Sequence, residues 1–135
     1  MSLSGPRIAT AGRGDGEFNY PMGVAVDRND NVWVADSWNS RVQEFDRDGE
    51  FLRNIGSKGT ENGQFIDPAG IASDAEGNIW VVDLGDANKL DWDRQVHGLA
   101  RVQKFDSQGH YLIQFGSFGK GDGQFRYPRC IAISN

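Results

Sequence analysis

The sequence contains the stretch "GEFNYPMGVAVDRNDNVWVAD" at residues 16–36 and a similar one, "GQFIDPAGIASDAEGNIWVVD", at residues 63–83. A third copy begins as "GQFRYPRCIAIS" at residues 123–134. Repetition of this kind marks proteins assembled from similar structural units, so the repeat decides the fold. With 135 residues, the chain holds two whole repeats and parts of others.

Each repeat contains four short segments rich in Val, Ile, Phe and Trp, separated by Gly, Asn or Asp. The first two lie in the quoted stretches, the third is "RVQEFD" (41–46) or "RVQKFD" (101–106), and the fourth follows a short turn. Gly49, Gly77 and Gly109 fall where a hairpin needs positive φ. The pattern predicts four-stranded antiparallel meanders, and its weak polar alternation indicates sheets covered on both faces, as in propeller blades.

These residues resemble the NHL repeat, the unit of a family of β-propellers that commonly close with about six blades. The resemblance covers almost the whole chain and implies an all-β fold of NHL-type blades, incomplete within one chain. Residues 1–135 are expected to form a single module with blades at about 18–56 and 65–116. Partial strands are expected at about 7–9 and 129–134.

Two blades are fewer than the three or more repeats that usually make such arrays stable. Each end of the array, around Ile8 and Ile131, should therefore present an apolar sheet face and unpaired strand edges. We expect these faces to be covered by the remaining blades of a longer propeller or by self-association. Because the two ends differ, contacts between copies would run head to tail.

The composition of the chain narrows the classes of partner and of cellular location that are expected. A net charge of −5 gives no general attraction to phosphate backbones, so nucleic acid is not expected as a partner. No apolar leader and no run of 18 apolar residues occurs, so neither a signal peptide nor a membrane span is expected. A single cysteine, Cys130, favours a reducing compartment such as the cytoplasm. It aligns with glycines of the other repeats, which predicts a small, buried and inert thiol.

An Asp closes the second segment of each repeat and an Arg opens the third, giving the pairs Asp36–Arg41 and Asp83–Arg101. Adjacent antiparallel strands bring these ends together. The pair could bind a ligand or hold the blade, and its recurrence in both units favours the structural role.

Other candidate sites are weaker. Residues 27–31, "DRNDN", have the alternating oxygens of a calcium loop but lack the required Gly and Glu, so a hairpin turn is the better interpretation. Two histidines, His97 and His110, cannot supply a three-imidazole zinc site from one chain. We therefore expect no catalytic residue, metal or cofactor.

The second repeat carries an insertion at residues 84–100, thirteen residues longer than the equivalent connection in the first. It emerges on the face that carries the loops between blades, and long loops on rigid scaffolds often bind partners. Its alternative role is to cover a neighbouring blade edge. The candidate binding residues are Asp86, Lys89, Asp91, Trp92, Asp93, Arg94 and His97.

The sequence thus favours a non-catalytic binding or assembly scaffold, most simply one for protein–protein interaction. The alternative is a fragment of a propeller enzyme, a metal-dependent lyase or lactone hydrolase, because some families resembling this one carry a metal on the propeller axis. Such a site would need further blades to complete its ligands.

Overall fold

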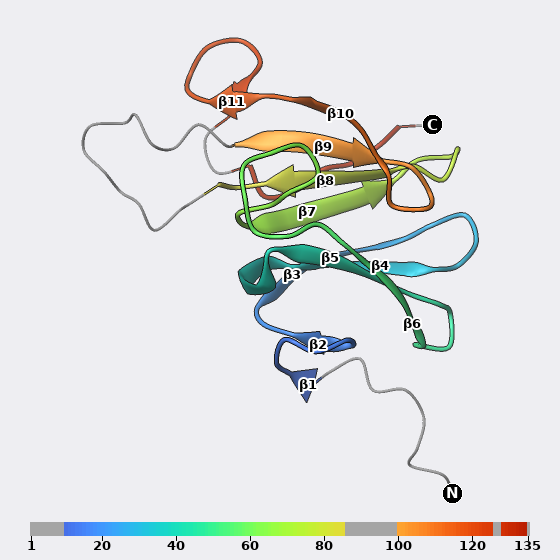
Figure 1. The fold of residues 1–135 in the computed structure, drawn as a ribbon. Coiled ribbons are helices and arrows are strands. Elements are labelled where there is room, and N and C mark those ends of the chain that lie inside the picture. Colours follow the sequence, from blue (N-terminus) through green and yellow to red (C-terminus); the bar gives the residue numbers. More distant parts are fainter. Residues whose placement is uncertain (1–9, 86–99, 126–127, 135) are drawn as a thin grey trace, which may run out of the picture.

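The computed structural model describes residues 10–85, 100–125 and 128–134. Two four-stranded antiparallel sheets are stacked one above the other (Figure 1), which confirms the all-β propeller-blade fold. In blade 1 the strands lie in the order β3-β4-β5-β6, and in blade 2 β7-β8-β9-β10. Their bounds are β3 Pro21–Val26, β4 Val32–Asp36, β5 Arg41–Phe45, β6 Phe51–Ile55, β7 Pro68–Ser73, β8 Ile79–Asp83, β9 Arg101–Phe105 and β10 Tyr111–Phe115.

The remaining elements are short and belong to the connections. Two parallel pairs stand before blade 1 and after blade 2, and one 3-10 helix joins β4 to β5. No helix among the described residues is long and apolar enough to cross a membrane. The bounds are β1 Thr10–Ala11, β2 Glu17–Phe18, η1 Ser37–Asn39, β11 Ser117–Phe118 and β12 Gln124–Phe125.

The hairpin turns are built by aspartates. Oδ1 of Asp27 accepts the backbone N–H groups of Asn29 at 2.8 Å and Asn31 at 3.0 Å. Its Oδ2 accepts the indole N–H of Trp33 at 2.8 Å. The "DRNDN" segment is therefore a hairpin turn whose leading carboxylate is engaged by protein donors. The glycines at 49, 77 and 109 have φ of 86°, 87° and 88°, as their turn positions require.

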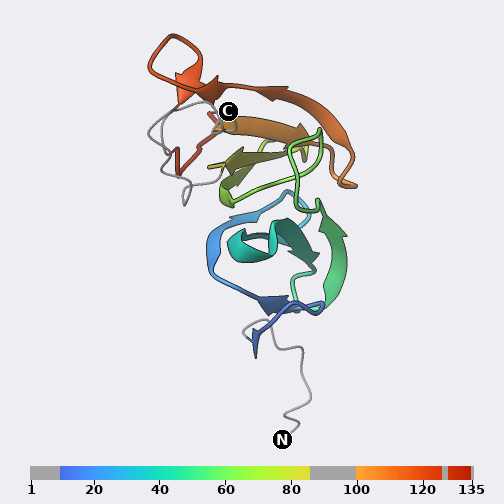
Figure 2. The same cartoon turned by 60° about the vertical axis from the view of Figure 1, so that its left-hand side comes forward.

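The main core lies between the two sheets. Figure 2 shows the sheets stacked face to face from a second direction. The two sheets approach each other closely at Gly23 of β3. A side chain there would not fit, because an added Cβ would strike the carbonyl oxygen of Ala69 on β7. Burying each large apolar side chain in this layer contributes about 1.5–3 kcal/mol. The buried cluster comprises Trp33, Val42, Ile55, Phe65, Ile71, Ile79, Val81 and Phe105.

The C-terminal segment differs from the prediction. Residues 129–134 form no strand, because no second strand pairs with them, whereas residues 7–9 lie outside the described part of the chain. The segment nevertheless lies against blade 2, since a Cβ on Gly70 would stand 2.6 Å from the carbonyl oxygen of Arg129. Cys130 is exposed, so the expectation of a buried thiol was wrong. Its burial would require a sheet on the other side.

Candidate docking faces

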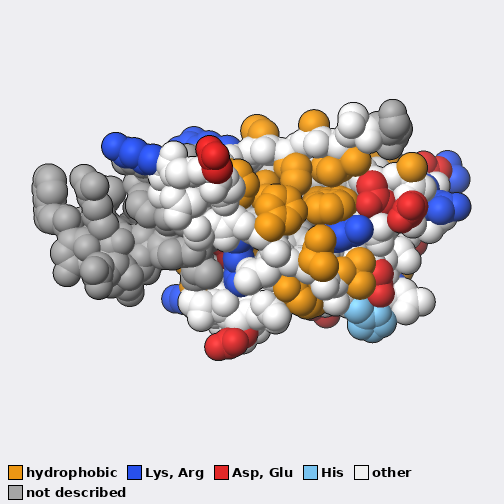
Figure 3. All heavy atoms as spheres, turned by 90° about the horizontal axis from the view of Figure 1, so that it is seen from above, with side chains coloured by type: hydrophobic (Ala, Val, Ile, Leu, Met, Phe, Trp, Pro, Cys, Tyr) orange, Lys and Arg blue, Asp and Glu red, His pale blue; other side chains and the backbone are white. Residues whose placement is uncertain are grey.

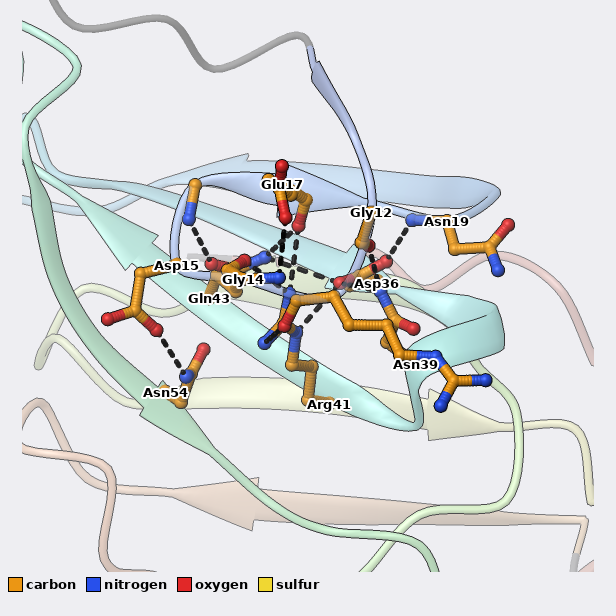
Figure 4. Close-up of polar contacts among 12 residues, drawn as sticks. Gly12, Gly14, Asp15, Glu17, Asn19, Asp36, Asn39, Arg41, Gln43 and Asn54 are labelled. Atoms are coloured by element: carbon orange, nitrogen blue, oxygen red, sulfur yellow. Dashed lines mark hydrogen bonds and ion pairs between the residues drawn. The ribbon is translucent and has the colours of Figure 1, made fainter.

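The aspartates that end β4 and β8 form the polar centres of the two blades. In blade 1, Asp36 is fully buried, and its Oδ2 lies 2.8 Å from Nε of Arg41 (Figure 4). In blade 2, Asp83 is fully buried, and its Oδ2 lies 3.7 Å from Nε of Arg101. The structure thus brings together the two members of each candidate pair. Asp36 also accepts the backbone N–H of Asn19 at 2.8 Å.

The arginines of these pairs hold the loop that precedes each blade. Nη1 and Nη2 of Arg41 donate to the carbonyl oxygens of Arg13, Gly14 and Glu17, each at 2.9 Å. Arg101 makes the same kind of contact with a different loop, and burial lowers its pKa, although the neighbouring Asp83 opposes that shift. The backbone acceptors of Arg101 are the carbonyl oxygens of Thr60, Glu61 and Gln64, and its Nη1 also donates to Oε1 of Gln114. Both pairs thus lie inside their blades, and Nε of Arg101 makes no hydrogen bond, in contrast to Nε of Arg41.

The sequence interpretation missed two buried glutamines. Nε2 of Gln43 donates to the carbonyl oxygen of Glu17 at 2.7 Å, and its Oε1 accepts the N–H of Gly16. Gln103 repeats this arrangement with the carbonyl oxygen of Gln64, and both glutamines are fully buried. The signal was present in the sequence, because "RVQ" recurs in phase in both repeats.

The candidate binding residues of the insertion, Asp86 to His97, all lie outside the described residues. His110 lies on an exposed turn, where its Nδ1 is 3.1 Å from Oδ2 of Asp106. Within the described part of the chain, no three His, Cys, Asp or Glu side chains gather as metal ligands would. Several of the exposed large apolar side chains lie on the outer faces of the two sheets.

The outer face of blade 1, here called the β3 face, consists of Met22, Val24 and Val26. These side chains alternate with Gly23, which faces blade 2, and are 43%, 63% and 57% exposed. Ile71 occupies the position of Val24 in the second repeat and is only 7% exposed, because blade 1 covers it. The same repeat position is thus buried where a preceding blade exists and exposed where none is described.

The outer face of blade 2, here called the β10 face, consists of Trp80, Lys104, Ile113 and Phe115. Phe115 is 47% exposed, whereas Ile55, its equivalent in blade 1, is 7% exposed and lies in the core. The rings of Trp80 and Phe115 meet edge to face at 6.2 Å, and Nζ of Lys104 lies 4.8 Å from the Trp80 ring centroid. Figure 3 shows hydrophobic side chains gathered in one patch on the side of the molecule that carries β10.

Comparison with solved structures supports the fold at low sequence identity. A protein of Bacteroides fragilis aligns with a TM-score of 0.57 at 20% identity, covering 84% of this chain and 28% of that one. A protein of Bacteroides caccae gives 0.52 at 17% identity, covering 83% and 34%. The two stacked meanders define a protein built of β-propeller blades.

Sequence comparison identifies the type of blade. The NHL repeat model matches residues 18–45. Protein lin-41 of Caenorhabditis elegans is 54% identical over 41 residues, covering 30% of this chain, and NHL repeat-containing protein 3 of Homo sapiens is 50% identical over 42 residues, also 30%. The chain therefore contains an NHL repeat at residues 18–45 and is similar there to NHL-repeat proteins. Its matched part spans only 4% and 12% of those two relatives.

Proposed function

We propose that this chain is a non-catalytic NHL-repeat module that acts as a binding and assembly scaffold, with the β3 face and the β10 face as its docking surfaces. The partner of each face is another blade of the same type. The observation that carries the proposal is the contrast between Val24, 63% exposed, and Ile71, 7% exposed, at one position of the repeat.

The internal junction supports a blade as the partner. On β7, the strand equivalent to β3, Ala69 and Ile71 are buried against blade 1. Exposed apolar side chains gathered on one sheet face are typical of interaction surfaces in proteins. A face with the same strand layout and the same apolar character is therefore suited to receive the same kind of neighbour.

Polar groups at the internal junction indicate how such a contact is oriented. Oγ of Ser73 donates to the carbonyl oxygen of Val26 at 3.0 Å, and Oγ of Ser40 donates to that of Ile66 at 2.9 Å. The first bond joins the ends of β7 and β3, and the second joins the connections that precede β5 and β7. An apolar centre with a polar rim is the ordinary anatomy of a protein–protein interface.

The test is the Val24→Glu variant. A carboxylate in the middle of the β3 face would have to be desolvated on docking, so association is expected to weaken at least about tenfold. The matched control is Asn62→Glu, which adds the same charge at an exposed loop position. Sedimentation velocity over a concentration series measures both variants against the unmodified chain. Equal association by Val24→Glu and the unmodified chain would reject the β3 face as a docking surface.

A further inference from the structure

We propose that the blade that docks on the β3 face is blade 2 of a second copy of this chain, bound head to tail through its β10 face in the geometry of the internal junction. This inference rests on the proposed function and names the partner.

The apolar groups of the two exposed faces match those of the internal junction. At that junction Trp33, Val42 and Ile55 of blade 1 pack into the shared cluster with residues of blade 2. Their equivalents in blade 2 are Trp80, Val102 and Phe115, of which Phe115 is exposed, Trp80 is partly buried and Val102 is buried. On the β3 face, Val24 is the exposed equivalent of Ile71. Val34 and Phe45, the equivalents of Val81 and Phe105, are buried in a cluster with Phe18.

The charges on the two outer faces favour a second copy of this chain as the partner. At the internal junction, Nη1 of Arg53 on β6 donates to the carbonyl oxygen of Gln108. This bond holds the turn at residues 106–110 of blade 2 against β6 of blade 1. Glu44 is paired with Arg53 at that point, with Nε and Oε1 2.5 Å apart. In blade 2 the equivalents of Glu44 and Arg53 are Lys104 and Ile113, so the paired charges are replaced by one cation.

The turn that would meet Lys104 in a second copy carries the opposite charge. The equivalent of turn 106–110 in blade 1 is residues 46–50, "DRDGE", which contain three acidic residues and one arginine. Asp48 and Glu50 are exposed. Head-to-tail docking would therefore bring the exposed Asp48 toward Lys104, whereas the internal junction has neutral Gln108 at the place of Asp48. Complementary charge of this kind selects the partner and its register.

The C-terminal segment competes with the incoming copy. Arg129 and Cys130 lie against Gly70 of β7 as Ala69 lies against Gly23 of β3. They therefore occupy the place that the first strand of an incoming blade would take. Because the segment forms no strand and Arg129 and Cys130 are exposed, a second copy can displace it, at the cost of a lower apparent affinity.

Charge reversal in mixed copies tests the arrangement. Lys104→Glu alone would place like charges together, and so would Asp48→Lys alone, so each variant is expected to associate about tenfold more weakly than the unmodified chain. An equimolar mixture of the two should recover the unmodified affinity to within about threefold, because each junction between unlike copies again joins opposite charges. Lys58→Glu, an exposed loop position, is the control and should associate normally.

A second variant tests displacement of the C-terminal segment. Ile131→Asp should loosen the segment from blade 2 and so strengthen association; weaker association would show that the segment belongs to the contact and would overturn this register. Sedimentation velocity gives the affinities, and far-UV circular dichroism checks that each variant folds.

The outcomes separate the two proposals. Failure of the mixture to recover, with association still sensitive to Val24→Glu, would reject the head-to-tail copy and keep the β3 face as a docking surface for a different blade. If the Val24→Glu variant associates as strongly as the unmodified chain, both the β3 face as a docking surface and the head-to-tail copy are rejected.

Discussion

Trp33 and Trp80 hold the same position in the two repeats and make the same hydrogen bond, but their burial differs. The indole N–H of Trp33 donates to Asp27 at 2.8 Å, and that of Trp80 donates to Asp74 at 3.0 Å. Trp33 is fully buried between the blades, whereas Trp80 is only partly buried, beneath Lys104. Each repeat therefore forms its own hairpin turn, whereas the burial of the tryptophan ring depends on whether a neighbouring blade covers it.

Replacing each tryptophan by alanine should separate these two contributions. Trp33→Ala removes a fully buried ring and is expected to lower the free energy of unfolding by about 3–5 kcal/mol. Trp80→Ala should cost about 1–2 kcal/mol in the isolated chain, because part of its ring already contacts water. Urea unfolding at a low protein concentration measures both. Equal losses would show that the two rings have the same surroundings.

Removing the arginine of blade 2 should be more damaging than removing that of blade 1. Arg101→Ala leaves the fully buried Asp83 without its cation and the loop at 60–64 without its anchor, so a loss of about 3–5 kcal/mol is expected. The side chain of Arg41 is 11% exposed against 2% for Arg101, so water can partly replace it near Asp36. Urea unfolding of Arg41→Ala should therefore show the smaller loss, and the reverse order would contradict this view of the pairs.

Glu44 predicts a pH dependence of stability. Burial raises its pKa and the nearby Asp27 adds to this, while Arg53 and Asn31 oppose the shift. The folded state therefore holds this proton more tightly than the unfolded state. The resulting stabilisation is complete below the ordinary pKa of 4.5 and is lost as the pH rises through the raised value.

The Glu44→Gln variant isolates this contribution. Relative to Glu44→Gln, the unmodified chain should lose stability as the pH is raised from about 4, below the ordinary pKa of 4.5, to about 7. Urea unfolding at both pH values gives the comparison. A difference between the two proteins that stays constant with pH would mean that Glu44 titrates alike in the folded and unfolded states.

The insertion should be dispensable for folding. Asp83 and Arg101 are register partners on β8 and β9, so the hairpin is closed before the insertion begins. Replacing residues 86–99 with a connection of the length of Ser37–Ser40 should change the free energy of unfolding by less than about 1 kcal/mol. Loss of the cooperative urea transition would show instead that the insertion is needed for the sheet to form.

The sequence predicted the blades well because each repeat contains the information for its own hairpins. Recurrent apolar segments separated by turns such as Asp27–Asn31 and Asp48–Gly49 were enough to place all eight blade strands. The repeat also placed Asp36 near Arg41, since the ends of neighbouring strands must meet.

Burial at the ends of the array could not be predicted in the same way. Cys130 aligns with the close-packed Gly23 and Gly70, but its exposure depends on whether a further sheet lies against it. For the same reason residues 129–134 carry the pattern of a strand without forming one, because a strand also requires a partner. The roles of Gln43 and Gln103 depended on loop carbonyl groups whose positions the sequence pattern does not give.

The most direct test of the central claim is the weight-average mass of the unmodified chain, measured by sedimentation equilibrium from low to high micromolar concentration. If the β3 and β10 faces are docking surfaces, the mass should rise with concentration above the 14.9 kDa of one chain. In a variant with Trp38 and Trp92 replaced by Phe, so that only the fully buried Trp33 remains beside it, the partly exposed Trp80 should become less accessible to a fluorescence quencher over the same range. A folded chain that keeps a mass of 14.9 kDa and an unchanged Trp80 accessibility throughout would contradict the account.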